Sequence, residues 1–280
     1  MKKLTIFCLF FSQMTFASFD MNEKIERSYF YIINLEFEKA NILLDEELFK
    51  DSNNGLITLH KNFIDFLTII ITEDYEYFKS HQHLKKERLK FLEKNDQESP
   101  YYLYCKAEIY LQWAFSRLKF QQYSTAIYEL ITAYKLLEQN KKKFPEFKLN
   151  YKPLGVLHTI LGAIPDEFSW LLNIAGLKGS IDLGINELNI VLNDNKYIMY
   201  EQEILFLLSF LQMNLANNDS LCMIYLDRIG DRYQDNILVA FAAARLSNYL
   251  GHNDHCIEVL NNKNNNNKIN FSYFHYLKGM

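Results

Sequence analysis

The stretch YYLYCKAEIYLQWAFSRLKFQQYSTAIYELITAYKLL, residues 101–137, predicts two antiparallel helices joined by a short turn. Small side chains stand where the two helices must approach closely, and large ones are their packing partners: Ala114, Ala126 and Ala133 are small, and Tyr110, Tyr123 and Leu130 are large. A helix pair of this kind cannot bury its apolar face alone. The sequence therefore predicts a stack of similar helix pairs.

The composition of the 280-residue chain agrees with this expectation. Hydrophobic residues make up 49% of the sequence, which is enough for a sizeable core. Glycine and proline are scarce, at 9 and 4 residues, whereas the chain has 19 tyrosines and 22 phenylalanines, a balance typical of continuous helices packed by aromatic side chains. The formal net charge is only -4 with acids and bases interspersed, so no nucleic-acid partner is expected.

A repeat is visible in the small residues near the start of each expected second helix. Cys222 and Cys256 lie 34 residues apart, and Ala40, Ala126 and Gly184 occupy the same place in earlier pairs. Thirty-four residues is the period of the tetratricopeptide repeat. The earlier spacings of 38, 58 and 86 residues are not multiples of it. The expected fold is therefore all-α: a tetratricopeptide-like α-solenoid of antiparallel helix pairs with irregular repeats and no sheet.

The expected organisation is a single solenoid over residues 18–280. Its parts are N-terminal helix pairs in residues 18–140, a glycine-rich helical hairpin in 153–184, and C-terminal repeats in 185–280. The helices expected first along the chain are residues 25–33, 37–48, 57–71 and 74–93. The prolines at its ends predict that residues 141–153 are a loop.

The N-terminal residues have the three-part pattern of a secretory signal peptide. Lys2 and Lys3 precede an apolar run at residues 4–11, and Thr15-Phe16-Ala17 offers a cleavage site between small residues. The alternative is a first core helix. We expect residues 1–17 to be removed on export, and the mature protein to reside in the periplasm or on the periplasmic face of an outer membrane.

Three segments in this order resemble a group of bacterial envelope tetratricopeptide-repeat proteins: IDFLTIIITEDYEYF, YCKAEIYLQWAFSRLKFQQYSTAIYELITAYKLLEQN and LGVLHTILGAIPDEFSWLLNIAGLKGSIDLGINEL. More distantly, they are similar to the eukaryotic tetratricopeptide-repeat-39 and inclusion-body-clearance family, whose members carry a comparable glycine-rich segment. The resemblance covers nearly the whole expected mature chain, but its motifs are packing motifs. It implies an α-solenoid with a scaffolding role, and it carries over no catalytic residue.

The best candidates for function are side chains on the expected first helices. In tetratricopeptide geometry these helices line the concave face, where a protein or peptide segment can bind. The candidate residues are Tyr29, Ile32, Phe115, Leu118, Phe241, Arg245 and Tyr249. Burial within an irregular stack is an equal alternative for each of them, since an exposed aromatic side chain needs a partner. The expected function is a non-catalytic scaffold that uses no cofactor.

Catalytic chemistry has weaker support in the sequence. His252, His255 and Cys256 form an H-x-x-H-C group without the second half of a zinc site, so no metal is expected. The acidic pair Glu201 and Glu203 lies near an expected helix start, where the helix dipole favours negative charge. The three cysteines left after export are an odd number, and we expect them to be small buried residues. An enzyme whose metal ligands are scattered along the chain is the alternative.

Peripheral membrane contact is a further alternative. It would use the hairpin over residues 153–176, which carries Phe168, Trp170 and Leu171, or the basic residues Lys85, Lys86 and Arg88. The competing prediction for the basic residues is a solvated helix face, because Glu87 and Glu93 are mixed among them.

The C-terminal residues 271–280, FSYFHYLKGM, predict the first helix of another pair without its second helix. A half-built unit leaves apolar side chains uncovered. We therefore expect either fraying of this helix or self-association through it.

Overall fold

A computed structural model describes residues 19–165, 167, 176–262 and 271–279 of the chain. These residues form thirteen α-helices with short 3-10 and π segments, and they contain no strand. The all-α prediction is confirmed. The expected signal peptide at residues 1–17 lies outside the described residues.

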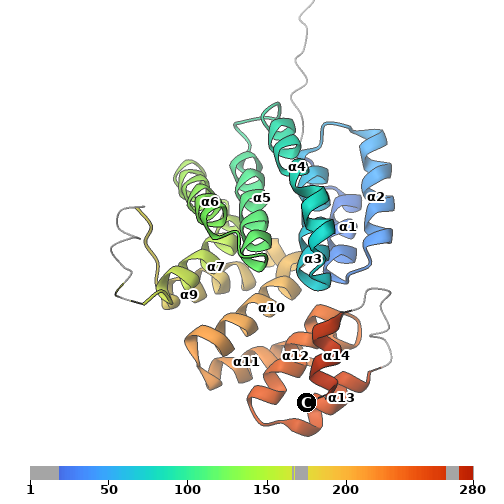
Figure 1. The fold of residues 1–280 in the computed structure, drawn as a ribbon, viewed down its shortest axis with the longest axis vertical. Helices are drawn as coiled ribbons and strands as arrows, with labels where there is room; N and C mark the ends of the chain where they lie inside the picture. The colour runs from blue at the N-terminus through green and yellow to red at the C-terminus, as the bar shows by residue number, and fades with distance from the viewer. Residues whose placement is uncertain (1–18, 166, 168–175, 263–270, 280) are drawn as a thin grey trace, which may run out of the picture.

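The helices follow one another as antiparallel pairs (Figure 1). The pairs are α1 (Glu23–Ile33) with α2 (Phe37–Lys50), α3 (Gly55–Thr72) with α4 (Tyr75–Leu92), α5 (Pro100–Lys119) with α6 (Tyr123–Lys143), α7 (Tyr151–Gly162) with α9 (Ile181–Leu192), α10 (Glu201–Leu211) with α11 (Asp219–Ile229), and α12 (Ile237–Tyr249) with α13 (Asn253–Asn261). Helix α14 (Ser272–Gly279) follows α13 in the sequence.

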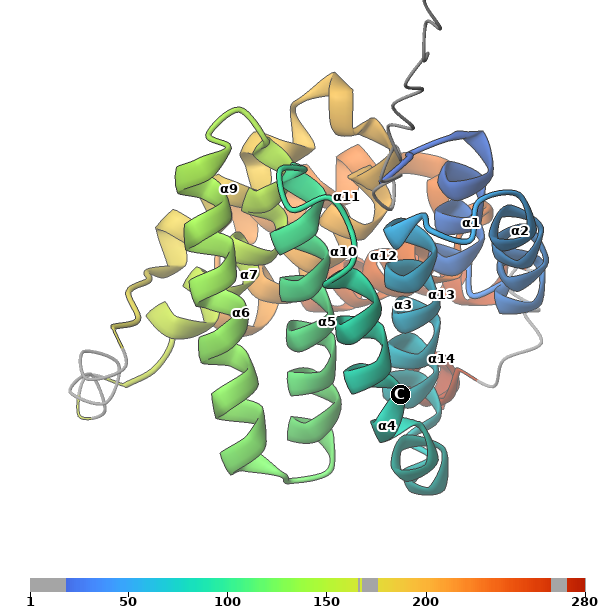
Figure 2. The same ribbon diagram turned by 90° about the horizontal axis from the view of Figure 1, so that it is seen from above.

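Most first helices pack on the first helix of the next pair, and α7 is the exception because it packs on α6. Helix α3 contacts α1 and α5, and α10 contacts α7 and α12. The N-terminal and C-terminal parts of the described chain also meet. Helix α14 contacts both its neighbour α12 and α3, which lies far away in the sequence. In Figure 1 the pairs from α1 to α6 lie above α10 and the helices from α11 to α14 lie below it, and Figure 2 shows α14 close to α3 from a second direction.

Side chains cap most helix starts, which explains why the helices begin where they do. At each start the side-chain oxygen accepts a hydrogen bond from a backbone N–H two or three residues later, satisfying a group that has no partner inside the helix. The capping residues are Asn22, Asn54, Asp74, Ser99, Ser180, Asn218 and Asn236. Several of these capped helices begin within about two residues of the position that the sequence predicted.

The small residues of the sequence repeat occupy one structural position. Five second helices carry a small, buried residue at their fourth position: Ala40, Ala126, Gly184, Cys222 and Cys256. At Gly184 the neighbouring helix α7 is so close that an added Cβ would lie 2.3 Å from the backbone oxygen of Gly155. Helix α4 is the exception, since it has the fully buried Phe78 at this place.

The loop predicted for residues 141–153 is wrong at both ends. Helix α6 continues through Lys143, and α7 begins at Tyr151 with Pro153 as its third residue. Proline is accepted in a first turn because the N–H that it lacks would have no partner there. Most of the second helix of the predicted hairpin, with Phe168, Trp170 and Leu171, lies outside the described residues.

One helix in the described part of the chain, α3, is long and apolar enough to span a membrane by length and composition. In the structure 67% of this helix is buried. It contacts α1, α2, α4 and α5, and its Asp65 forms an ion pair with Arg88 of α4 at 2.6 Å. These contacts are those of a central core helix.

Candidate binding groove

A groove of about 220 Å³ lies across α10, α12 and α14. Its lining is apolar or aromatic except at two positions, Ser209 and Arg245. The lining residues are Phe206, Ser209, Phe210 and Met213 of α10 and the segment after it, Phe241, Ala242 and Arg245 of α12, and Tyr273, Tyr276 and Leu277 of α14. Helices α10, α12 and α14 therefore build this surface, with α12 in the middle.

The groove exposes aromatic rings on both of its sides. Phe210 of α10 is 52% exposed and Tyr276 of α14 is 66% exposed. Phe241 lies between them on α12, with its ring centroid 6.5 Å from that of Phe206 and 6.5 Å from that of Tyr273. Exposed apolar surface gathered in one place is typical of an interaction site.

Among the described residues, Arg245 is the only charged one that lines the groove. Its side chain is partly buried, and the structure gives it no hydrogen bond or ion pair with any described residue. Partial removal of a guanidinium from water without an acceptor is unfavourable. The groove therefore presents a cation that an incoming carboxylate can pair with through two parallel hydrogen bonds.

Helix α14, which forms one side of the groove, is attached to the N-terminal half of the chain through Tyr273. Lys119, the last residue of α5, donates hydrogen bonds to the Tyr273 hydroxyl at 2.7 Å and to Glu73 at 2.5 Å, and Tyr273 also donates one to Glu73. The hydrogen bond from Lys119 and that from Tyr273 lower the pKa of the Glu73 carboxyl below its usual value. Tyr273 is thus held at both its ring and its hydroxyl group.

The seven residues predicted from the sequence divide into three groups. Phe241 and Arg245 both line the groove. Phe115 and Leu118 of α5 are partly buried and lie outside the groove. Tyr249, at the end of α12, is 39% exposed and hydrogen-bonds to Asp219, so it too lies beyond the groove.

Tyr29 and Ile32 are buried within the fold, which was the alternative to a binding role, and their exposed fractions are 3% and 0%. The reason is that other helices of the chain cover this face of α1. The Tyr29 ring packs edge-on against Tyr200 at a centroid distance of 4.9 Å, and its hydroxyl donates a hydrogen bond to Glu203 of α10. A partner has no access to these two side chains in the folded protein.

An ionic cluster lies where these inner helices meet. Lys152 of α7 lies between two carboxylates, with its Nζ 2.9 Å from Glu108 of α5 and 2.8 Å from Glu203 of α10. Burial alone would lower the pKa of Lys152, but the two carboxylates raise it overall. The hydroxyl of Tyr104 donates a further hydrogen bond to Glu108 at 3.0 Å.

The cavity beside this cluster has a volume of about 20 Å³. That is room for about one water molecule. The cluster therefore joins α5, α7 and α10 through charge and offers no space for a substrate. Near it lies His60, whose pKa burial and Lys152 lower to about 3, and whose Nδ1 lies 2.8 Å from the Ser28 hydroxyl.

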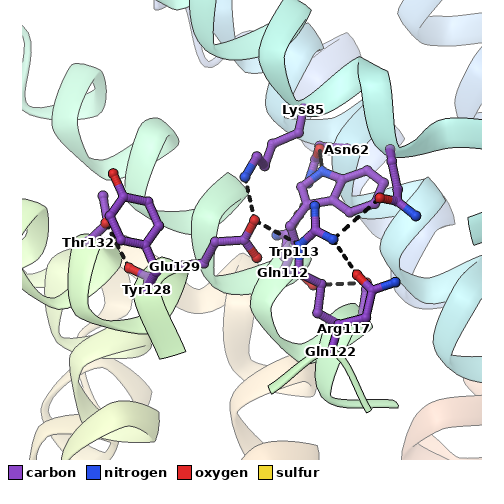
Figure 3. Close-up of polar contacts among 11 residues, drawn as sticks. Asn62, Lys85, Gln112, Trp113, Arg117, Gln122, Tyr128, Glu129 and Thr132 are labelled. Carbon is purple, nitrogen blue, oxygen red and sulfur yellow. Dashed lines mark hydrogen bonds and ion pairs between the residues drawn. The ribbon is translucent and has the colours of Figure 1, made fainter. Parts of the chain in front are cut away.

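A second buried network joins α3, α4, α5 and α6 (Figure 3). Glu129 of α6 is fully buried and pairs with Lys85 of α4 and with Arg117 of α5, the latter at 2.9 Å. Asn62 of α3 accepts a hydrogen bond from the Trp113 indole at 2.9 Å. These contacts hold the helix pair α3–α4 against the pair α5–α6.

Sequence reasoning missed this second network. The prediction that Lys85 and Arg88 lie on a solvated helix face is wrong, since both pair with buried or nearly buried carboxylates, those of Glu129 and Asp65. One feature of the sequence could have revealed the network. Glu129 lies three residues after Ala126 and four before Ala133, which places its carboxylate on the helix face that packs against α5. Tyr123, which the sequence predicted as a packing partner between the two helices, is instead 57% exposed.

The cysteines and histidines have structural surroundings. Cys105, Cys222 and Cys256 are free and buried, as expected for small core residues. His255 lies 2.7 Å from the Ser247 hydroxyl and packs edge-on against Tyr233. Within the described ranges no group of three or more histidine, cysteine or acidic side chains is placed to hold a metal ion.

No protein-family model, curated protein or solved structure matches this chain.

Proposed function

We propose that this protein is a non-catalytic tetratricopeptide-like scaffold that binds a segment of another protein in the groove across α10, α12 and α14. The order of helix pairs supports this assignment: most first helices pack on the next first helix, although α7 packs on α6 more than on α5, and a small residue near the start of most second helices permits close pairing. Stacks of this kind present extended concave surfaces that bind other proteins.

The observation that carries the proposal is the groove itself. Phe210, Phe241 and Tyr276, from α10, α12 and α14, surround a space of about 220 Å³ beside Arg245, which has no partner among the described residues. Exposed aromatic side chains and arginine are the residue types enriched at the energetic centres of protein interfaces. Pockets that enclose a whole small molecule have roughly 300–1,000 Å³, so this groove suits one or two side chains of a longer segment.

We further propose that the chain is exported, with residues 1–17 as its signal peptide, and acts in the periplasm or at the periplasmic face of an outer membrane. The Lys2-Lys3 start and the apolar run that follows support this location. Mass spectrometry of the purified native protein should give a mature N-terminus near Ser18. An intact Met1 would contradict export.

Site-specific photocrosslinking in the native cells tests the binding role. A photoreactive phenylalanine analogue is placed at Tyr276 in the groove and, as the matched control, at Phe49 of α2, which is 96% exposed and remote from the groove. We expect one protein adduct from Tyr276 and none from Phe49, and the purified partner should bind the purified scaffold. Equal labelling from both sites, or none from Tyr276, would overturn the proposed function.

A further inference from the structure

We propose that the groove recognises an internal acidic residue of its protein partner, whose side-chain carboxylate pairs with Arg245 while apolar neighbours fill the groove on either side. This inference rests on the proposed function and names the chemistry of the partner. It starts from the charge of the groove, because Arg245 is its only charged lining residue and has no partner among the described residues.

The identity of the cation favours a carboxylate. A guanidinium presents a planar fork of donors that matches the two oxygens of a carboxylate. In the described part of the chain, no lysine and no other arginine lines the groove. One cation neutralises one carboxylate, whereas a lipid phosphate surface is bound by clusters of several basic residues.

The position of Arg245 favours an acidic residue inside a segment. Arg245 stands on α12, the middle helix of the groove, with Phe206 and Phe210 on the α10 side and Tyr273 and Tyr276 on the α14 side. A segment that crosses the three helices therefore meets apolar surface before and after the arginine. Its carboxylate should be flanked by aromatic or large aliphatic residues.

The remaining charged groups near the groove do not compete for this role. Glu73 lies near the α14 wall, but its carboxylate already accepts hydrogen bonds from Lys119 and Tyr273. The described lining residues include no aspartate or glutamate that could neutralise Arg245. The guanidinium is thus available to a ligand.

An array of C-terminally amidated twelve-residue peptides tests the inference. Each peptide carries a central Glu, Gln or phosphoserine flanked by Phe, Leu or Ser, and its binding is measured by fluorescence anisotropy. The proteins are the wild type, Arg245→Met, and the control Arg27→Met, whose arginine is exposed on α1. Amidation removes the terminal carboxylate, so any acid preference must come from the side chain.

We expect Glu peptides with Phe or Leu neighbours to bind the wild type and Arg27→Met roughly 10- to 100-fold more tightly than their Gln counterparts, the range for a hydrogen-bonded charge pair. Arg245→Met should abolish the difference while keeping weak binding through the aromatic walls. Circular dichroism confirms that the variants are folded.

Apolar peptides that bind equally with Glu and Gln would overturn the inference and leave the proposed function standing. A preference for phosphoserine peptides would also overturn it, in favour of a phosphate ligand. If no peptide binds, the inference fails, and the crosslinking from Tyr276 decides separately whether the groove binds protein at all.

Discussion

The hydroxyl of Tyr29 on α1 donates a hydrogen bond to the carboxylate of Glu203 on α10, although 174 positions separate the two residues in the sequence. Glu203 in turn pairs with Lys152, and Lys152 with Glu108. The inner face of the N-terminal pairs is therefore filled by the chain's own side chains. The groove lies elsewhere, across α10, α12 and α14.

Replacing Lys152 with methionine should strongly destabilise the fold. The change leaves Glu108 and Glu203 buried without a cation, and removing one partner of a buried ion pair costs about 3–5 kcal/mol. The control is Lys24→Met, since Lys24 is 41% exposed and pairs with an exposed glutamate, Glu46. That change should cost less than about 1 kcal/mol. Urea denaturation measures both, and similar losses for the two variants would contradict the role of the cluster.

Glu129 should be needed for the packing of α6 against α4 and α5. Glu129→Gln removes the charge that Lys85 and Arg117 share, and we expect a loss of about 3–5 kcal/mol in the free energy of unfolding. Glu138→Gln is the matched control on the same helix, because Glu138 is 43% exposed and lies 3.9 Å from Lys141. If both variants unfold at the wild-type urea concentration, the network does not stabilise the fold.

Stability should depend on pH through His60. Its pKa in the folded protein is about 3, whereas a histidine in an unfolded chain has a pKa of about 6.5. Because the folded pKa is depressed, the contribution of His60 is complete above about pH 6.5 and is lost as the pH falls towards 3. The free energy of unfolding should fall by about 1.4 kcal/mol per pH unit within this window.

Denaturation at pH 7 and pH 5 checks this slope, with His60→Gln as the variant that cannot titrate at this position. The free energy of unfolding of the variant should depend less on pH than that of the wild type. The difference in slope should correspond to the uptake of about one proton on unfolding. An NMR titration of the imidazole gives the pKa directly, and a value near 6.5 would show that the expected slope is wrong.

Close contact between α7 and α9 should make Gly184 intolerant of a side chain. In Gly184→Ala the new Cβ would lie 2.2 Å from the Thr159 hydroxyl oxygen and 2.3 Å from the Gly155 carbonyl oxygen, so the helices must separate. Such overpacking costs about 1–3 kcal/mol. Gly279→Ala has no atom within 4 Å of its new Cβ and should be neutral. Thermal denaturation compares the two, and equal melting temperatures would argue against tight packing.

Helix α14 should exchange its amide hydrogens faster than α12. It has eight residues, and of its side chains only those of Phe274 and Leu277 are buried, whereas α12 has nine buried residues. Hydrogen exchange followed by mass spectrometry measures both helices. Equal protection in a monomer would show that α14 is a finished cap, and slow exchange that appears only with dimer formation would indicate self-association.

Local features of the fold could be predicted from the sequence because they depend on neighbouring residues. Asn54 and Asp74 cap the helices that were predicted to begin near them, and the spacing of Ala126 and Ala133 predicted the packed face of α6. The pairing of Tyr29 with Glu203 could not be predicted, since no local pattern reports a contact between residues so far apart.

In the candidate site, too, the features that depend on local sequence were predicted and those that depend on long-range contacts were not. Phe241 and Arg245 were predicted because they lie on a first helix. Phe210 and Tyr276 were missed as groove residues, because the groove depends on how α10 and α14 are placed on either side of α12. The tie from Tyr273 to Lys119 that fixes α14 is a tertiary contact as well.

The ionic cluster also has a consequence for how the chain reaches its native state. During synthesis Glu108 emerges well before Lys152, and Tyr29 emerges before Glu203. Domains generally begin to fold from the N-terminus as they are made, and contacts between distant residues form slowly. The first helix pairs therefore cannot complete their inner packing until α10 has been made. A chain that ends before α10 should be loosely packed and open to proteases, and a chain that extends through Leu211 should be protected.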